Sequence, residues 1–176
     1  AAGSSGGASS AVAAGMLPFA DGTDQMGSCR GPAAFANIYG FRPTPGLIPS
    51  DRSSHDKKLP ILTTPGCFGR TPEDMSYFLD IVVGKDKTDP FSFNIEGKFY
   101  DCELNDNEFS KTKICWLSDM DNSYELEDGI EDMCNKKLKE LEKNNLSIVL
   151  PDIKINTDYL WQSWICLRSK SIYNDT

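Results

Sequence analysis

The sequence predicts an α/β fold, and three features of its 176 residues support that prediction. Residues 113–152 show strand, helix and strand patterns in succession, at the spacing of a βαβ unit with a right-handed crossover. A capped amphipathic helix is predicted to begin at Thr71. Residues 1–50 are apolar and contain only four charged side chains, which is typical of the interior of a larger core.

The first part of the chain is expected to contain short elements separated by turns. Residues 8–16 are predicted to form a helix of small side chains, and residues 17–24 a brief strand that ends in a turn. Pro32 suits the first position of a second helix. Residues 38–50 combine the aromatic residues of a strand with the prolines of a chain that leaves the core. Residues 51–70 are expected to be a surface loop.

The helix after this loop has the clearest start signal. Thr71 is expected to be its N-cap, with Pro72 at the first position and Asp74 in the first turn. Gly84 would follow its end. Its apolar face would comprise Met75, Phe78, Leu79 and Val82.

The predicted βαβ unit consists of a strand at 113–119, a helix at about 123–143 and a strand at 146–152. The apolar face of this helix would comprise Leu126, Ile130, Met133, Cys134, Leu138 and Leu141. Cys115 and Cys134 fall within these patterns and are expected to be buried thiols. The three tryptophans are expected in a core or an interface: Trp116, Trp161 and Trp164.

Composition excludes several function classes. The net charge of −8 lies wholly on residues 51–176, which argues against a nucleic-acid or anionic-membrane partner. No apolar run approaches the ~20 residues of a membrane span. The six cysteines form no C-x-x-C pair and the single histidine is His55, so we expect no metal and no cofactor. Free thiols indicate a reducing, cytoplasmic setting.

Two glycine- and serine-rich blocks contain the candidate chemistry: GSSGGASSAVAAG at 3–15 and DGTDQMGSCRGPA at 21–33. The first block alone could be a flexible linker. A phosphate-binding P-loop is excluded, because no lysine occurs before Lys57. A Ser-His-Asp triad would have to use His55, which lies in a polar stretch and is expected simply to contact solvent.

Together the two blocks resemble the signature segment of the amidase signature family of Ser–Ser–Lys hydrolases, whose pattern is roughly GGSSGGS…GTDxGGSxRxPA. The 24-residue separation of Ser4 from Ser28 is the one that this family uses. GFRPTPGLIP, GRTPEDMSYFLDIVVG, KICWL and IVLPD resemble the family's continuation. The resemblance implies a mixed-sheet α/β core with flanking helices, present here only in part. Residues 1–50 would be the signature segment, 51–110 a loop and helix, and 111–176 a βαβ-like portion.

The resemblance also assigns roles to residues of the two blocks. Ser28 would be the nucleophile, and Ser4, on a cis peptide bond, would relay the proton to a lysine upstream of the first block, outside this chain. Ser5, Asp24 and Arg30 would support the site, the last two by holding the turn. Cys29 is expected to be a packed thiol. The oxyanion hole would use backbone N–H groups of Gln25, Met26, Gly27 and Ser28. Met26-Gly27 replaces the family's usual Gly-Gly, and Gln25 replaces a commoner threonine.

The expected function is hydrolysis of a small-molecule carboxylic amide through an acyl-serine. The alternatives are an amidotransferase subunit of the tRNA-dependent type and a non-catalytic interaction subunit on the same scaffold. We expect the chain to be part of a longer amidase and inactive by itself, with the remaining segments of that protein as its partners. A homo-oligomer stays open.

Overall fold

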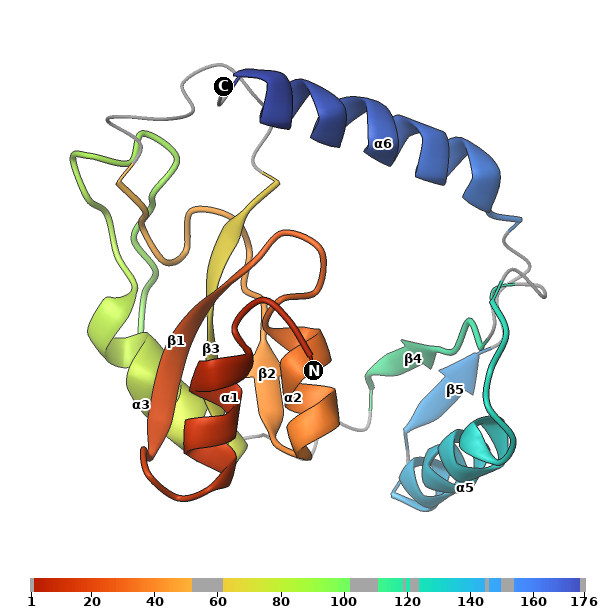
Figure 1. Cartoon of the computed structure of the whole chain (residues 1–176). Coiled ribbons are helices and arrows are strands. Elements are labelled where there is room, and N and C mark those ends of the chain that lie inside the picture. Colours follow the sequence, from red (N-terminus) through yellow and green to blue (C-terminus); the bar gives the residue numbers. More distant parts are fainter. Residues whose placement is uncertain are drawn as a thin grey trace. The chain divides into compact units, whose positions relative to one another are not determined.

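The computed structural model describes residues 2–51, 62–101, 111–118, 120, 124–144, 146–149 and 154–174. The chain separates into two compact units, Ala1–Cys102 and Glu103–Thr176 (Figure 1). The first unit contains both serine-bearing blocks, and the second contains the predicted βαβ segment. His55 lies outside the described residues.

A three-stranded antiparallel sheet forms the centre of the first unit, in the order β1-β3-β2. The strands are β1 (Phe19–Asp24), β2 (Tyr39–Phe41) and β3 (Thr64–Gly69). Helices α1 (Gly6–Ala13) and α2 (Arg30–Ala36) lie on one face of the sheet, and α3 (Pro72–Val82) lies on the other (Figure 1). The chain therefore has the predicted α/β character, with helices flanking the sheet.

Strand β3 corrects the prediction of a surface loop over residues 51–70, of which 52–61 lie outside the described residues. It is the central strand, and Cys67 and Phe68 are fully buried on its opposite faces. Two glycines and a proline masked the strand pattern. Pro65 is tolerated because β2 pairs only with Cys67, Phe68 and Gly69, so β3 has a partner on one side only at the proline.

Two apolar clusters hold the helices to the sheet. Val12 of α1, Cys29, Ala33 of α2 and Phe68 form the first cluster. Leu79 of α3 packs with Ile48 and Cys67 in the second, against which the other predicted face residues of α3 also pack. The sheet is thus covered on both faces, which fixes β1 and the turn that follows it.

The start of α3 is confirmed in detail. Thr71 is the N-cap, and its Oγ1 accepts a hydrogen bond from the Asp74 N–H at 3.1 Å. The Asp74 carboxylate accepts one from the Thr71 N–H at 3.2 Å, which completes a capping box, and Pro72 occupies the first position. Gly84 follows the helix end with φ of +138°.

Helix α2 begins two residues earlier than its proline suggested. Pro32 stands at the third position, because Cys29 is the N-cap and Arg30 the first helical residue. The carboxylate of Asp24 accepts hydrogen bonds from the N–H groups of Cys29 and Arg30, so a side chain from the end of β1 satisfies the start of this helix. Pro32 has no N–H and needs no such partner.

The second unit contains the predicted βαβ segment. Strands β4 (Lys113–Cys115) and β5 (Ser147–Val149) pair in parallel, with α5 (Ile130–Lys143) between them in sequence. The helix starts later than predicted, at Ile130, because Gly129 precedes it with φ of +86°. Leu126 therefore lies outside the helix. Cys115 is exposed rather than buried, because only Ile114 of this three-residue strand is partly covered.

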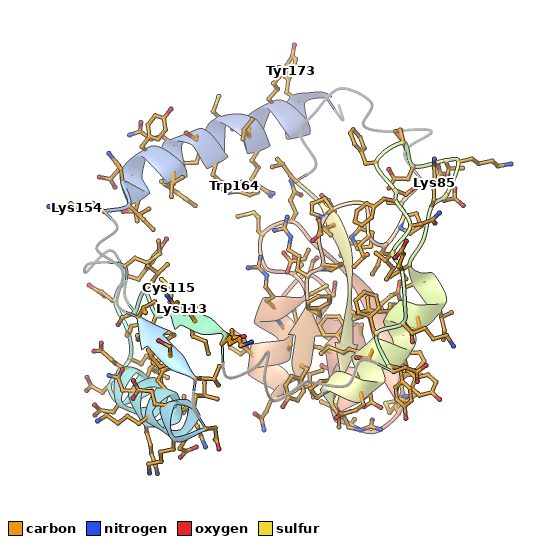
Figure 2. The ribbon with its side chains drawn as sticks, turned by 180° about the vertical axis from the view of Figure 1, so that it is seen from behind. Lys85, Lys113, Cys115, Lys154, Trp164 and Tyr173 are labelled. Carbon is orange, nitrogen blue, oxygen red and sulfur yellow. The ribbon has the colours of Figure 1, made fainter. Side chains whose placement is uncertain are left out.

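Helix α6 (Thr157–Asn174) was not predicted, because its apolar residues surround the helix instead of forming one stripe. Trp164 and Tyr173 project from opposite sides of it (Figure 2). Trp161 is 57% exposed and so does not belong to a core of this unit. Within the described part of the chain, no helix combines the length and hydropathy needed to cross a membrane.

Candidate functional site

The two serine-bearing blocks meet at the C-terminal end of strand β1, at Thr23. Ser5 Oγ lies 3.4 Å from the Thr23 N–H nitrogen and 3.5 Å from the Thr23 carbonyl oxygen. The peptide bond between Gly3 and Ser4 is cis, as the resemblance implied. Ser5 thus joins the loop that carries Ser4 to the strand that leads to Ser28.

Asp24 is the centre of the second block. It is fully buried, and its carboxylate accepts hydrogen bonds from the N–H groups of Gly27 at 2.8 Å, Cys29 at 3.3 Å and Arg30 at 3.4 Å. The guanidinium of Arg30 adds two more, from Nε to Oδ2 and from Nη2 to Oδ1, both at 2.9 Å. Asp24 and Arg30 therefore bond to each other and to the turn that carries Ser28.

The charges around Asp24 keep its carboxylate ionised. Burial alone would raise the pKa of Asp24, but hydrogen bonds from the Arg30 side chain and from three backbone N–H groups outweigh it and hold the pKa well below its usual range. The hydrogen bond to Asp24 in turn raises the pKa of Arg30. The turn therefore has a buried, permanently charged anchor at neutral pH.

Arg42 is a second cation at this anchor, which sequence reasoning missed. Its Nη1 lies 3.8 Å from Asp24 Oδ1, and its Nη2 donates to the Leu62 carbonyl oxygen at 3.1 Å. No motif of the sequence pointed to it, because β2 brings it to the turn only through pairing with β3. Two guanidinium groups thus share one carboxylate beside the candidate nucleophile.

The Asp24 anchor reduces the set of backbone N–H groups that can form the expected oxyanion hole. The Gly27 N–H already donates to Asp24, so it is engaged within the turn, and Gly27 has φ of +96°. The N–H groups of Gln25, Met26 and Ser28 have no acceptor within the described part of the chain. Met26 is not among the residues with positive φ, which explains how a side chain fits where the family commonly has glycine.

The hydroxyls of the two candidate catalytic serines share no hydrogen-bond partner among the described residues. Ser28 is half-buried and Ser4 is exposed. Neither hydroxyl makes a hydrogen bond with any described residue. Ser4 instead lines a cleft of about 490 Å³ between α1 and α2, together with Pro32 and Phe35. Both hydroxyls are thus free to engage other groups.

Cys29 is a packed thiol, as expected. It is fully buried, and burial, followed by the nearby Asp24 carboxylate, raises the pKa of Cys29 to about 12. Burial likewise raises the pKa of Cys67 to about 11. Both thiols are protonated at neutral pH and cannot compete with Ser28 as nucleophiles.

Candidate bases and metal ligands are scarce in the described residues. The described lysines of the first unit, Lys85, Lys87 and Lys98, are all exposed, and Figure 2 shows Lys85 on the loop that follows α3. No group of three or more His, Cys, Asp or Glu side chains in the described ranges could hold a metal ion.

Comparison with known proteins defines the class. The family model for amidases matches residues 1–172. The chain therefore belongs to the amidase signature family. Its sequence is 32% identical over 158 residues to a glutamyl-tRNA(Gln) amidotransferase subunit of Acinetobacter baumannii, covering 90% of this chain and 32% of that protein.

Solved structures agree with this assignment. The crystal structure of the corresponding glutamyl-tRNA(Gln) amidotransferase subunit from Thermotoga maritima matches with a TM-score of 0.77 and 25% identity, covering 96% of this chain and 36% of that one. A bacterial aryl acylamidase of the amidase signature family matches with a TM-score of 0.74 and 25% identity, over 94% of this chain and 34% of that one. The chain thus spans about a third of the length of these relatives.

Proposed function

We propose that the protein containing this chain is an amidase that hydrolyses a carboxylic amide through an acyl-serine on Ser28. The observation that carries the proposal is the buried Asp24 anchor. It binds the N–H groups of Gly27, Cys29 and Arg30, whereas the N–H groups of Gln25, Met26 and Ser28 and the Ser28 hydroxyl have no hydrogen-bond partner among the described residues. A nucleophile and unpaired donors on one rigid turn are what acyl transfer requires.

The reaction follows from this arrangement. Ser28 Oγ attacks the amide carbonyl carbon and loses its proton, and the carbonyl oxygen becomes an oxyanion that the free N–H groups can bind. One well-placed donor of this kind contributes about 3–4 kcal/mol. The C–N bond then breaks, the amine or ammonia leaves with a proton, and water hydrolyses the serine ester.

Proton transfer requires a base, and we assign the relay to Ser4 and the base to a lysine outside the described residues. A lysine acts as a base only when burial lowers its pKa, and the described lysines of the first unit are exposed. Ser4 supports the relay because its hydroxyl makes no hydrogen bond to any residue that the structure describes, and because Ser5 ties its block to β1. In the working enzyme the two serine hydroxyls must approach within about 3 Å of each other, or of a shared water.

The experiment is an amide-hydrolysis assay of the complete protein with Ser28→Ala. The change removes one oxygen, so we expect activity to fall by at least about a thousandfold while the protein stays folded. Ser76→Ala in α3, on the far face of the sheet, is the matched control and should retain activity. Full activity in Ser28→Ala would refute the proposal.

The second candidate is an amidotransferase subunit, which the similarity to glutamyl-tRNA(Gln) amidotransferases favours. In that case the same Ser28 chemistry would release ammonia from a donor amide for use by a partner protein. Turnover of simple amides by the purified protein alone, at a rate that added partners do not change, supports the amidase and counts against the amidotransferase.

A further inference from the structure

Gly22 in β1 is half-buried and has no side chain, and atoms of Phe68, Ser5 and Cys29 fill the space beside its Cα, here called the hollow. A Cβ atom at this position would lie 2.8 Å from Phe68 Cε2, 2.9 Å from Ser5 Oγ and 3.1 Å from Cys29 Sγ. Real Cβ atoms essentially never approach other atoms more closely than 3.0 Å. The φ of Gly22 is not in the positive region. The position therefore needs glycine because of the space that its neighbours occupy, and not because of its backbone conformation.

The side chains in this hollow belong to the direct neighbours of the two candidate catalytic serines. Ser5 follows Ser4 in the first block, and Cys29 follows Ser28 in the second. Side chains from both blocks thus lie against the same residue of β1, Gly22.

Gly66 forms the other half of the hollow. It pairs with Gly22 across β1 and β3, and a Cβ at Gly66 would lie 3.0 Å from Cys29 Sγ and would collide with the Phe41 carbonyl oxygen. Directly opposite residues on antiparallel strands share a face of the sheet. Cys29 Sγ therefore packs against two glycines, Gly22 of β1 and Gly66 of β3, and a side chain at either position would crowd it.

Backbone contacts make Cys29 a rigid link to Ser28. Its N–H donates to Asp24 Oδ2 at 3.3 Å, and its side chain is fully buried with Val12, Ala33 and Phe68. A shift of the thiol would therefore be transmitted to the adjoining Ser28. Displacements of about 1 Å at a reacting group can lower rates about a hundredfold.

We propose that Gly22 and Cys29 are positioning residues that set the separation of Ser4 and Ser28 by packing the Ser5 and Cys29 side chains into one hollow. The proposal rests on the function proposed above. Neither residue touches the reacting atoms. Their effect is on the rate of attack by Ser28, with substrate binding left in place.

The test compares Gly22→Ala, Cys29→Ala and the double variant in the complete protein. Gly22→Ala should lower kcat about tenfold or more, with KM within about twofold of the parent value, and should slow phosphonylation of Ser28 by a fluorophosphonate, in which the Ser28 oxygen bonds to phosphorus and fluoride leaves, in parallel. Cys29→Ala in the same background removes the Sγ contact at 3.1 Å and gives the Phe68 ring end, which would lie 2.8 Å from the new methyl group, room to move away, while the contact with Ser5 Oγ at 2.9 Å remains. It should restore several-fold of the lost kcat. Gly31→Ala is the control, because a Cβ there meets nothing within 4 Å.

Parent kcat in folded Gly22→Ala, or losses that simply add in the double variant, would overturn the proposal. If Gly22→Ala does not fold, Cys29→Ala alone decides: an unchanged rate of Ser28 phosphonylation by the fluorophosphonate overturns the proposal, and a slower rate with KM for the amide unchanged supports it. The Ser28→Ala assay distinguishes failure of the proposed function from failure of the positioning proposal alone. Retained activity there removes the proposed function itself, whereas an inactive Ser28→Ala with a fully active Gly22→Ala removes only the positioning role.

Discussion

Arg30 donates to both carboxylate oxygens of Asp24, Nε to Oδ2 and Nη2 to Oδ1, each at 2.9 Å. The two partners differ in environment, because Asp24 is fully buried while the Arg30 side chain is 55% exposed. Loss of Asp24 would leave three backbone N–H groups and a guanidinium without their acceptor. The carboxylate is therefore the partner on which the turn depends.

Asp24→Asn should destabilise the protein by about 2 kcal/mol, the usual contribution of hydrogen bonds to a charged group. The amide retains one acceptor oxygen but loses the charge and the second acceptor. Urea unfolding of both proteins at pH 7 measures the difference. Asp74→Asn is not a suitable control, since it disturbs a cap; Asp21→Asn, on an exposed position of β1, is expected to be neutral.

The stability difference between the parent and Asp24→Asn should depend on pH. Folding lowers the pKa of Asp24, so the unfolded chain binds more protons between the folded pKa and the ordinary value of about 4. The stabilisation is therefore complete above about pH 4 and declines as the pH falls toward the lower folded value. Unfolding at pH 7, 5 and 3.5 should show a constant difference followed by a smaller one. A difference that grows on acidification would contradict the assignment.

Substitution by alanine should have different effects on stability and activity at Gly27 and at Met26. Gly27 has φ of +96°, where an L side chain costs about 1–3 kcal/mol, and its N–H binds Asp24. Gly27→Ala should therefore lower both stability and activity, whereas Met26→Ala keeps the backbone and should change chiefly substrate preference. Thermal unfolding and kcat/KM on a series of acyl chain lengths distinguish the two. Equal losses in both variants would show that the Met26 side chain is structural.

The capping box of α3 offers a test of the fold apart from the site. Thr71→Ala removes the acceptor of the Asp74 N–H and should cost about 1 kcal/mol in unfolding free energy, while Thr71→Ser retains the oxygen and should cost little. Amide hydrolysis should be unaffected in both at a temperature where they stay folded.

Local sequence signals predicted those elements whose boundaries are set by side chains within the element itself. Thr71, Pro72 and Asp74 specify the start of α3 without reference to the rest of the chain, and the structure confirms each position. Strand β3 escaped prediction for the opposite reason. A Cβ at Gly66 would collide with the Phe41 carbonyl oxygen and crowd Cys29 Sγ, both distant in sequence, so the property that removed the strand signal is a tertiary requirement.

The same difference between local motifs and tertiary contacts applies to the candidate site. The resemblance of the two blocks to the family's signature segment indicated Ser4, Ser28 and the Asp24–Arg30 pair, because each lies within a contiguous motif. Arg42 reaches Asp24 only through sheet pairing, and the engagement of the Gly27 N–H depends on the three-dimensional turn. No pattern of residue types contains such information.

The most direct measurement of the central claim is the site of covalent labelling in the complete protein. We expect a fluorophosphonate to phosphonylate one residue stoichiometrically, and peptide mass spectrometry to place the adduct on Ser28, with labelling abolished in Ser28→Ala and retained in Ser76→Ala. A stoichiometric adduct on another residue, with hydrolysis lost in step with it, would contradict the account.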